Sequence, residues 1–95
     1  MVVRFYARIA SEGNKLSFVI PKSLIESVSE ARDIVEKGKG IASIYGVSFI
    51  FKVRKVRLRL RSGEVVVHRV TVPASIVKRF GLSKGQKVFV EMTPL

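Results

Sequence analysis

One short pattern occurs twice in this chain, and it constrains the fold more than any single residue does. Residues 19–25, VIPKSLI, are followed 52 positions later by residues 71–77, TVPASIV. Each copy comes after a polar turn with one glycine, Gly13 or Gly63, and a strand-like run of alternating apolar residues. Internal repetition is typical of folds built from similar supersecondary units. Units of roughly 45 residues are too small to bury separate cores, so we expect the two to share one.

The first repeat reads as two strands, a helix and a strand. Its alternating runs predict strands over 2–10 and 16–20, the second ending at Pro21. Ser23 followed by Glu26 forms a capping box, which predicts a helix over 24–37. Lysines and glycines at residues 37–40 then end this helix, and extended structure follows.

The second repeat has the same order with shorter elements. It is predicted to contain strands over 56–61, 65–72 and 87–92 and a helix over 74–80, which Gly81 caps. The expected organisation is one domain over residues 1–95, with repeats at about 1–54 and 55–95.

The extended run over 41–61 changes its apolar face once. Phe51 and Val53 are apolar at odd positions, whereas Val56 and Leu58 are apolar at even ones. Side chains alternate strictly along a strand, so this shift predicts a β-bulge or a break at Arg54–Lys55. The predicted irregularity coincides with the boundary between the repeats.

The composition limits the possible classes of protein. The chain of 95 residues has no cysteine and no run of ~18 apolar residues, which argues against disulfides, thiolate metal sites and a spanning helix. Its N-terminus has no signal-peptide pattern, so the cytoplasm is the expected compartment. The net charge of +11 predicts attraction to polyanions.

The positive charge is concentrated in one segment. Between residues 52 and 61 there is no acidic residue, and six are basic: Lys52, Arg54, Lys55, Arg57, Arg59 and Arg61. On a strand Arg57, Arg59 and Arg61 share the outward face at intervals of about 6.5–7 Å. That interval is close to the spacing of phosphates along one nucleic-acid strand. The segment therefore predicts a nucleic-acid site; the alternative is a solvated strand whose charges prevent edge-to-edge pairing.

Residues 71–91 resemble the signature of the AbrB/SpoVT/MazE family. The shared features are the apolar–proline pair Val72–Pro73, a short helix, the Gly81–Leu82 pair, a turn with Gly85 and a valine-rich strand. The first repeat matches only over 19–25, because its helix is longer and more acidic and no Gly-Leu pair follows it.

Members of this family are small DNA-binding regulators, including the antitoxins of toxin–antitoxin pairs, and usually form a β-barrel from two identical chains. The resemblance implies a mainly β fold with two short helices, whose repeats interlock as a double-psi or AbrB-like swapped-hairpin β-barrel. The double-psi form is favoured, because the family's usual strand after the last one matched is missing. The protein would be a monomeric pseudo-dimer or a homodimer.

The resemblance also implies which residues contact DNA. The family's contacts come from basic residues near the first strand, the following turn and the start of the helix. Together with the basic strand, the matching positions give eight candidates: Arg8, Lys15, Lys55, Arg57, Arg59, Arg61, Lys78 and Arg79. We therefore expect a nucleic-acid-binding protein, with duplex DNA favoured, that acts as an AbrB-like transcriptional regulator or as an antitoxin.

A protein-interaction β-barrel is the alternative. It would act as an adaptor, or bind a toxin or an ATPase, without specific nucleic-acid binding. An enzyme is not expected, because the chain has a single aspartate and no plausible triad. We also expect no cofactor and no metal: His68 is the only histidine, and the loops at 37–40 and 84–87 do not complete a phosphate-loop pattern.

Overall fold

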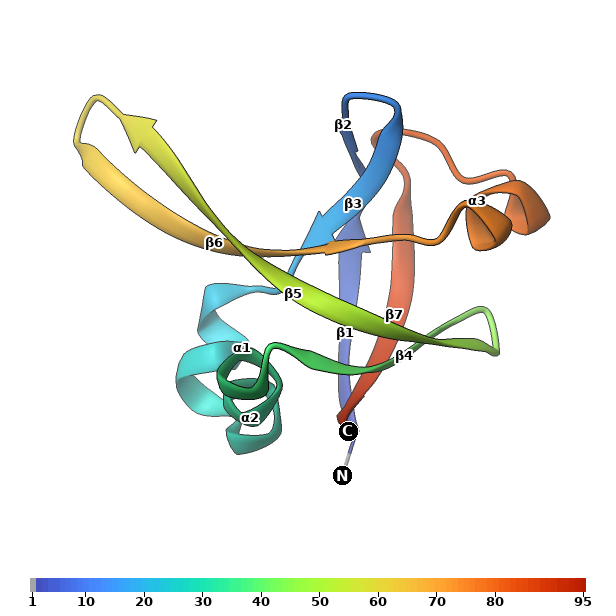
Figure 1. Cartoon of the computed structure of the whole chain (residues 1–95), viewed down its shortest axis with the longest axis horizontal. Helices are drawn as coiled ribbons and strands as arrows, with labels where there is room; N and C mark the ends of the chain where they lie inside the picture. Colours follow the sequence, from blue (N-terminus) through green and yellow to red (C-terminus); the bar gives the residue numbers. More distant parts are fainter. Residues whose placement is uncertain (1) are drawn as a thin grey trace.

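The computed structural model describes residues 2–95 as a mainly β fold with three helices (Figure 1). Seven strands form an antiparallel sheet in the order β1-β7-β4-β5-β6-β3-β2, and within this range no ladder closes the sheet between β1 and β2. The elements are β1 (Val3–Arg8), β2 (Ala10–Glu12), β3 (Lys15–Val19), α1 (Lys22–Ser27), α2 (Ser29–Lys37), β4 (Lys39–Ile44), β5 (Val47–Leu60), β6 (Gly63–Thr71), α3 (Ala74–Phe80) and β7 (Lys87–Pro94). The mainly β prediction is confirmed, but three helices replace the two expected.

The additional helix arises because the helix predicted over 24–37 is divided. Val28 has an extended backbone, with φ −117° and ψ 118°, and separates α1 from α2. The predicted capping box of Ser23 and Glu26 is wrong, since α1 begins directly after Pro21 and has no side-chain cap. The fixed φ of a proline suits the entry to a helix, so the chain starts the helix earlier than the capping pattern suggests.

The core consists of the inward-facing residues of the strands and one face of α2. In β1, buried and exposed residues alternate one by one, as period two requires. Phe18 and Val70 are fully buried, and Ala31 and Ile34 pack α2 against the same core. Across residues 2–95, the helices lack the combination of length and hydropathy that crossing a membrane would require.

The two repeats pair with each other around an approximate two-fold axis. Phe18 of β3 lies opposite Val70 of β6, and these two residues are equivalent in the 52-residue repeat. The hydrogen bonds on either side are also repeat equivalents, each 2.9 Å long: Ile20 N–H to the His68 carbonyl and Val72 N–H to the Leu16 carbonyl. The duplication seen in the sequence is therefore a duplication in space.

The remaining strands interlock the two repeats. β7 of the second repeat lies between β1 and β4 of the first and pairs with both. β4 pairs in turn with the first part of β5. Each repeat thus completes the sheet of the other, which is why neither has a core of its own.

β5 contains neither the bulge nor the break predicted at Arg54–Lys55. It runs continuously over Val47–Leu60, pairing with β4 through Lys52 and with β6 from Val53 onward. The strand changes its partner, and its apolar residues change face, while the register stays regular on each side. The boundary predicted between residues 54 and 55 therefore falls inside one strand.

Gly81 ends α3 in the left-handed conformation, with φ 60° and ψ 41°, as the sequence predicts. A Cβ atom at this position would meet nothing within 4 Å, so a substitution acts through backbone strain and not through a clash. We expect Gly81→Val to lower the free energy of unfolding by about 1–3 kcal/mol, because a β-branched residue rarely adopts positive φ. Denaturant unfolding measures this change. Gly81→Asn should cost less, and equal stability of Gly81→Val and the wild type would contradict the cap.

Candidate nucleic-acid interface

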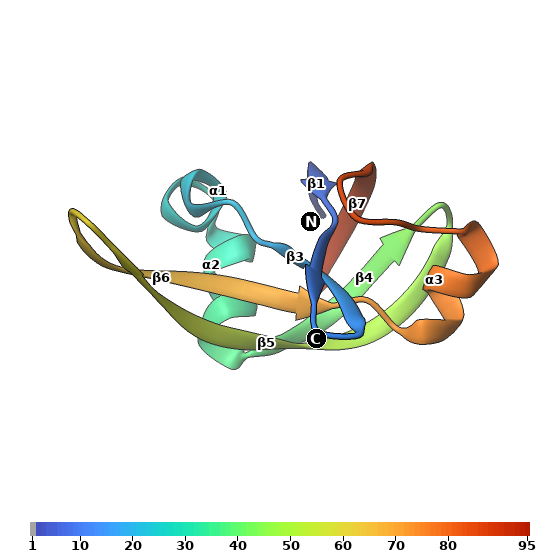
Figure 2. The ribbon, with the colours of Figure 1, turned by 90° about the horizontal axis from the view of Figure 1, so that it is seen from above.

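A hairpin projects from the body of the fold. Over residues 55–68, β5 and β6 pair with each other and with no other strand of residues 2–95. We call residues 55–68 the arm; in Figures 1 and 2 it extends away from the rest of the sheet. A two-stranded hairpin on its own is marginally stable in water, so an arm of this length is expected to have a function beyond the core.

The arm is an extension that only the second repeat has. In the first repeat Glu12 pairs with Lys15, and two residues, 13–14, close the hairpin. Lys15 is the repeat equivalent of Val67, whose partner is Val56. Beyond that pair, ten residues, 57–66, form the rest of the hairpin. The first repeat builds its part of the core without such an extension, so the core does not require it.

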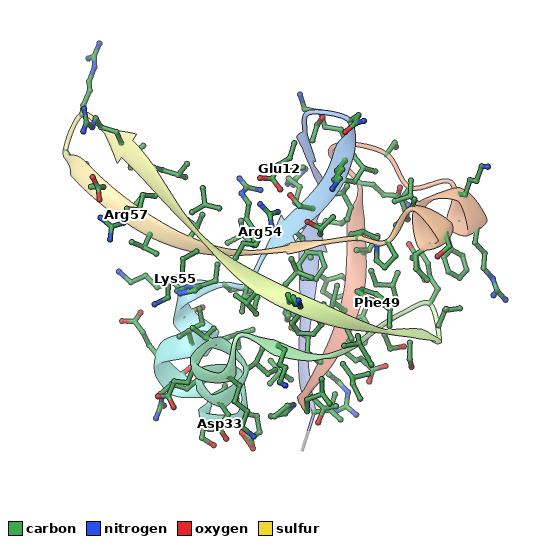
Figure 3. The ribbon with its side chains drawn as sticks, in the orientation of Figure 1. Glu12, Asp33, Phe49, Arg54, Lys55 and Arg57 are labelled. Carbon is green, nitrogen blue, oxygen red and sulfur yellow. The ribbon has the colours of Figure 1, made fainter. Side chains whose placement is uncertain are left out.

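One face of the arm is basic. Cross-strand pairing places Lys55, Arg57 and Arg59 on the same face as Glu64 and His68. The Arg57 side chain is 78% exposed and lies 3.4 Å from the Glu64 carboxylate, a weak surface ion pair. Within residues 2–95 the side chains of Lys55, Arg59 and Arg61 make no hydrogen bond or ion pair. Figure 3 marks Lys55 and Arg57 on the arm. Three cations are thus available to a ligand.

The opposite face of the arm is apolar. It carries Val56, Leu58 and Leu60 from β5 with Val65 and Val67 from β6, and none of them packs against the core. Leu60 is 50% exposed and Val65 is 40% exposed. The expectation that these even positions of β5 face the core is wrong. The arm extends past the core, so neither of its faces has a second layer to cover it.

Two more of the candidate residues lie together in a groove beside α3. Lys15 and Lys78 line a cavity of about 520 Å³ between the β2–β3 turn and α3. A neighbouring cavity of about 370 Å³ is lined by Lys15, Glu12, Arg54 and Thr71. Because the two cavities share Lys15, basic side chains continue from Arg54 towards α3, on the face of the sheet opposite the basic face of the arm.

The structure does not bring all eight candidates together. Figure 1 shows the arm and α3 at opposite ends of the longest axis, whose extent is 38 Å. Arg79 is exposed on α3, with its guanidinium 5.6 Å from the centre of the Phe80 ring. Arg8 donates a hydrogen bond to the Gly85 carbonyl, at the end of β1. The candidates therefore form an arm group, a Lys15–Lys78 group and two separate residues.

Arg54 is not among the eight candidates, although it lines the cavity beside Lys15. Its guanidinium, which lies beside Glu12 in Figure 3, donates to both carboxylate oxygens of Glu12 and to the hydroxyl of Thr71. The bond to Arg54, helped by Ser17 and by the charge of Arg69, holds the pKa of Glu12 below its usual value, and the same pair raises the pKa of Arg54. Only its place in the basic run of residues 52–61 pointed to this residue.

His68 lies at the base of the arm and remains neutral at physiological pH. Partial burial lowers the pKa of its imidazole, and the positive charge of Lys55, opposite it on β5, lowers that pKa further. His68 lies 52 positions after Leu16, and the carbonyls of these two residues accept equivalent hydrogen bonds from Ile20 and Val72.

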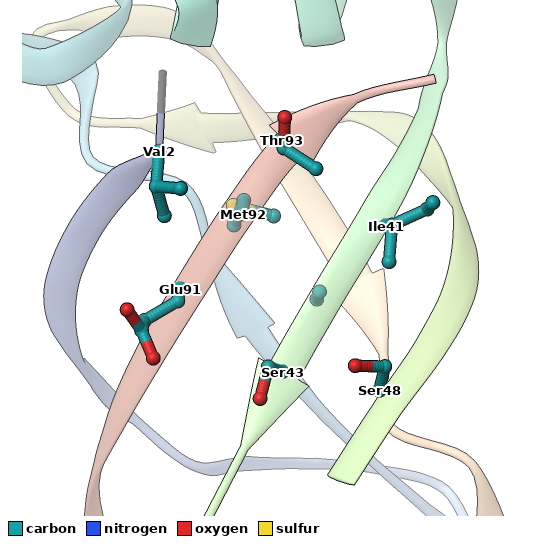
Figure 4. A pocket seen from close by; sticks show the side chains of 8 residues that line it. Val2, Ile41, Ser43, Ser48, Glu91, Met92 and Thr93 are labelled. Atoms are coloured by element: carbon teal, nitrogen blue, oxygen red, sulfur yellow. The ribbon is translucent and has the colours of Figure 1, made fainter. Parts of the chain in front are cut away.

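A hollow on the sheet offers little chemistry. Val2, Ile41, Ser43, Ser48, Glu91 and Met92 are among the residues around its volume of about 210 Å³ (Figure 4). Its carboxylate, from Glu91, accepts a hydrogen bond of 2.9 Å from Arg4. Over residues 2–95 no three His, Cys, Asp or Glu side chains come close enough to hold a metal ion.

No family model matches the chain, and no curated protein matches it at a significant level. The resemblance of residues 71–91 to the AbrB/SpoVT/MazE signature therefore stays a prediction.

Proposed function

We propose that this protein binds duplex DNA, with the arm as its main contact, and acts as an AbrB-like transcriptional regulator or antitoxin. One observation carries the proposal: the second repeat has an extension that the core does not use, and this extension holds Arg57, Arg59 and Arg61. A charged hairpin without a packing role is typical of a binding element. Phosphates are the ligand that a cationic surface of this density attracts.

The shape of the arm supports contact with a groove of the duplex. The major groove of B-DNA accepts a two-stranded β-ribbon, and the arm is such a ribbon. Alternate residues on its basic face are about 6.5–7 Å apart, a spacing that suits successive phosphates. Arginine side chains can form paired hydrogen bonds to a phosphate or to a guanine edge.

The second basic group extends the proposed contact. Lys15 and Lys78 share one groove, and Arg54 lines the neighbouring cavity. Alternation along β5 places Arg54 on the face opposite Arg57, so this group would contact DNA separately from the basic face of the arm. The interlocked repeats support, as part of this proposal, a fold related to the swapped-hairpin or double-psi barrels.

The salt dependence of binding tests the arm directly. Four to six phosphate contacts predict a slope of roughly −4 to −5 when log affinity for duplex DNA is plotted against log salt concentration. We expect the triple variant Arg57→Gln, Arg59→Gln, Arg61→Gln to weaken binding to every sequence and to reduce the slope by about 2–3. Fluorescence anisotropy across a salt series measures both quantities.

A matched triple variant on the helix side removes the same charge elsewhere. Lys37, Lys39 and Arg32 are exposed there, and Arg32 bonds the carbonyls of Ile25 and Glu26. Glutamine at these three positions retains hydrogen-bond donors and should change the slope much less. Equal losses of DNA affinity from both triple variants would mean that the overall positive charge of the protein, and not the arm, attracts the DNA. Absence of binding near ~50 mM salt would favour the protein-interaction alternative.

A further inference from the structure

A second groove lies between the arm and α1. Its volume is about 470 Å³, within the range of ligand-binding cavities. One wall is the part of β6 over residues 64–68, and the opposite wall is α1, with Lys22, Ile25 and Glu26. Val19 and Ile20 form its base, where the chain leaves β3.

This groove is the repeat counterpart of the groove with Lys15 and Lys78. Ile25 corresponds to Val77, and the base of one groove corresponds to the base of the other. The two lysines, however, are replaced: Lys15 by Val67 and Lys78 by Glu26. The groove beside α1 is therefore unsuited to phosphate. The two grooves occupy equivalent places in the two repeats but have different chemistry.

The β6 wall of this groove is a free strand edge. The His68 carbonyl accepts a hydrogen bond from Ile20 N–H on this side of β6. Because backbone groups alternate in direction along a strand, Glu64 and Val66 direct their N–H and C=O groups to the same side. Among residues 2–95, nothing pairs with them there. These groups match the backbone of another extended segment.

The two edges of the arm differ in how they are protected. The β5 edge carries Lys55, Arg57 and Arg59, and such charges discourage pairing with another strand. The β6 edge is a run of three valines, residues 65–67, with Glu64 as its single charge. β-Branched residues favour strand pairing, so only the β6 edge is suited to it.

We propose that this groove binds one extended strand of a partner protein, which pairs with Glu64 and Val66 of β6. β3 already pairs with β6 over residues 69–71 and leaves this edge after Ile20. A bound strand would continue the line of β3 past that point. α1 forms the far wall, so the groove holds a single strand, whereas the arm of a second copy would bring its own paired strand.

The lining defines the side chains of the bound strand. Ile20, Ile25 and Val67 present apolar surface, and Lys22 and Glu26 lie on α1 at the rim with opposite charges. A strand with apolar β-branched residues at alternate positions and no net charge fits this surface best.

A synthetic peptide tests the proposal without knowledge of the natural partner. The probe is an acetylated and amidated hexapeptide with alternating threonine and valine. We expect its addition to the ¹⁵N-labelled protein to shift the amide signals of residues 63–68 and 22–26. Val66→Pro removes the N–H that faces the groove but keeps the bonds of Val65 and Val67 to β5, so it should weaken binding at least about tenfold.

Peptide methylation provides a measurement that does not depend on the folding of a variant. Methylating the backbone nitrogens of one alternate set of peptide residues should abolish binding, and methylating the other set should not, because one peptide edge faces β6. Equal binding of both methylated peptides, or no amide shifts at about 1 mM peptide, would overturn the proposal. Concentration-dependent dimerisation with shifts at residues 63–67 would overturn it in favour of a second copy.

Discussion

Replacing residues 57–66 with a Gly-Asn dipeptide is expected to abolish tight DNA binding and leave the fold intact. The first repeat closes the equivalent hairpin with Gly13 and Asn14, and Gly13 has the positive φ of 62° that such a turn uses. The shortened chain keeps Val56 and Val67 as its last pair. It loses Arg57, Arg59 and Arg61 together, so affinity should fall at least about 100-fold near 0.1 M salt.

The control for this variant lies on the same arm. Leu58→Thr with Leu60→Thr alters the apolar face, keeps every charge and should change DNA affinity by less than about twofold. Thermal unfolding of the shortened chain should remain cooperative, since none of its deleted residues belongs to the core. Retained tight binding by the shortened chain would disprove the role of the arm. Loss of the fold would show that the arm supports the core.

Separating the repeats is expected to remove the fold completely. Fragments 1–54 and 55–95 divide β5, and β7 of the second fragment pairs with β1 and β4 of the first. Phe18 and Val70, both fully buried, contact across the same division. Each fragment alone exposes this apolar surface, so it should be unfolded or should assemble with another copy of itself.

Circular dichroism and sedimentation of each fragment, and of an equimolar mixture, test this prediction. Neither fragment should give a cooperative transition as a monomer. The mixture should recover the spectrum of the intact chain, because all pairings of β7 and β6 become available again. A stably folded monomeric fragment would be incompatible with interlocked repeats.

Part of the candidate site was predictable because it depends on local pattern. The period-two run of Arg57, Arg59 and Arg61 predicts exposed cations on a strand; all three are exposed, although β5 ends at Leu60 and Arg61 lies in the turn that follows. Lys15 and Lys78 followed from the resemblance, and the structure places both in one groove. The sequence did not predict the role of Arg54, because its partners, Glu12 and Thr71, are distant in the chain.

By itself, the sequence determined the repeat, most of the strands, α3 with its Gly81 cap and the separation of basic from apolar residues on β5. These features arise from interactions between near neighbours and from period-two burial. Tertiary structure alone decided that β5 is continuous and that its second half leaves the core. Alternation in a strand shows which residues share a face but not what covers that face. Pairing between distant strands determines what covers each face, and this pairing leaves the apolar face and the β6 edge of the arm open.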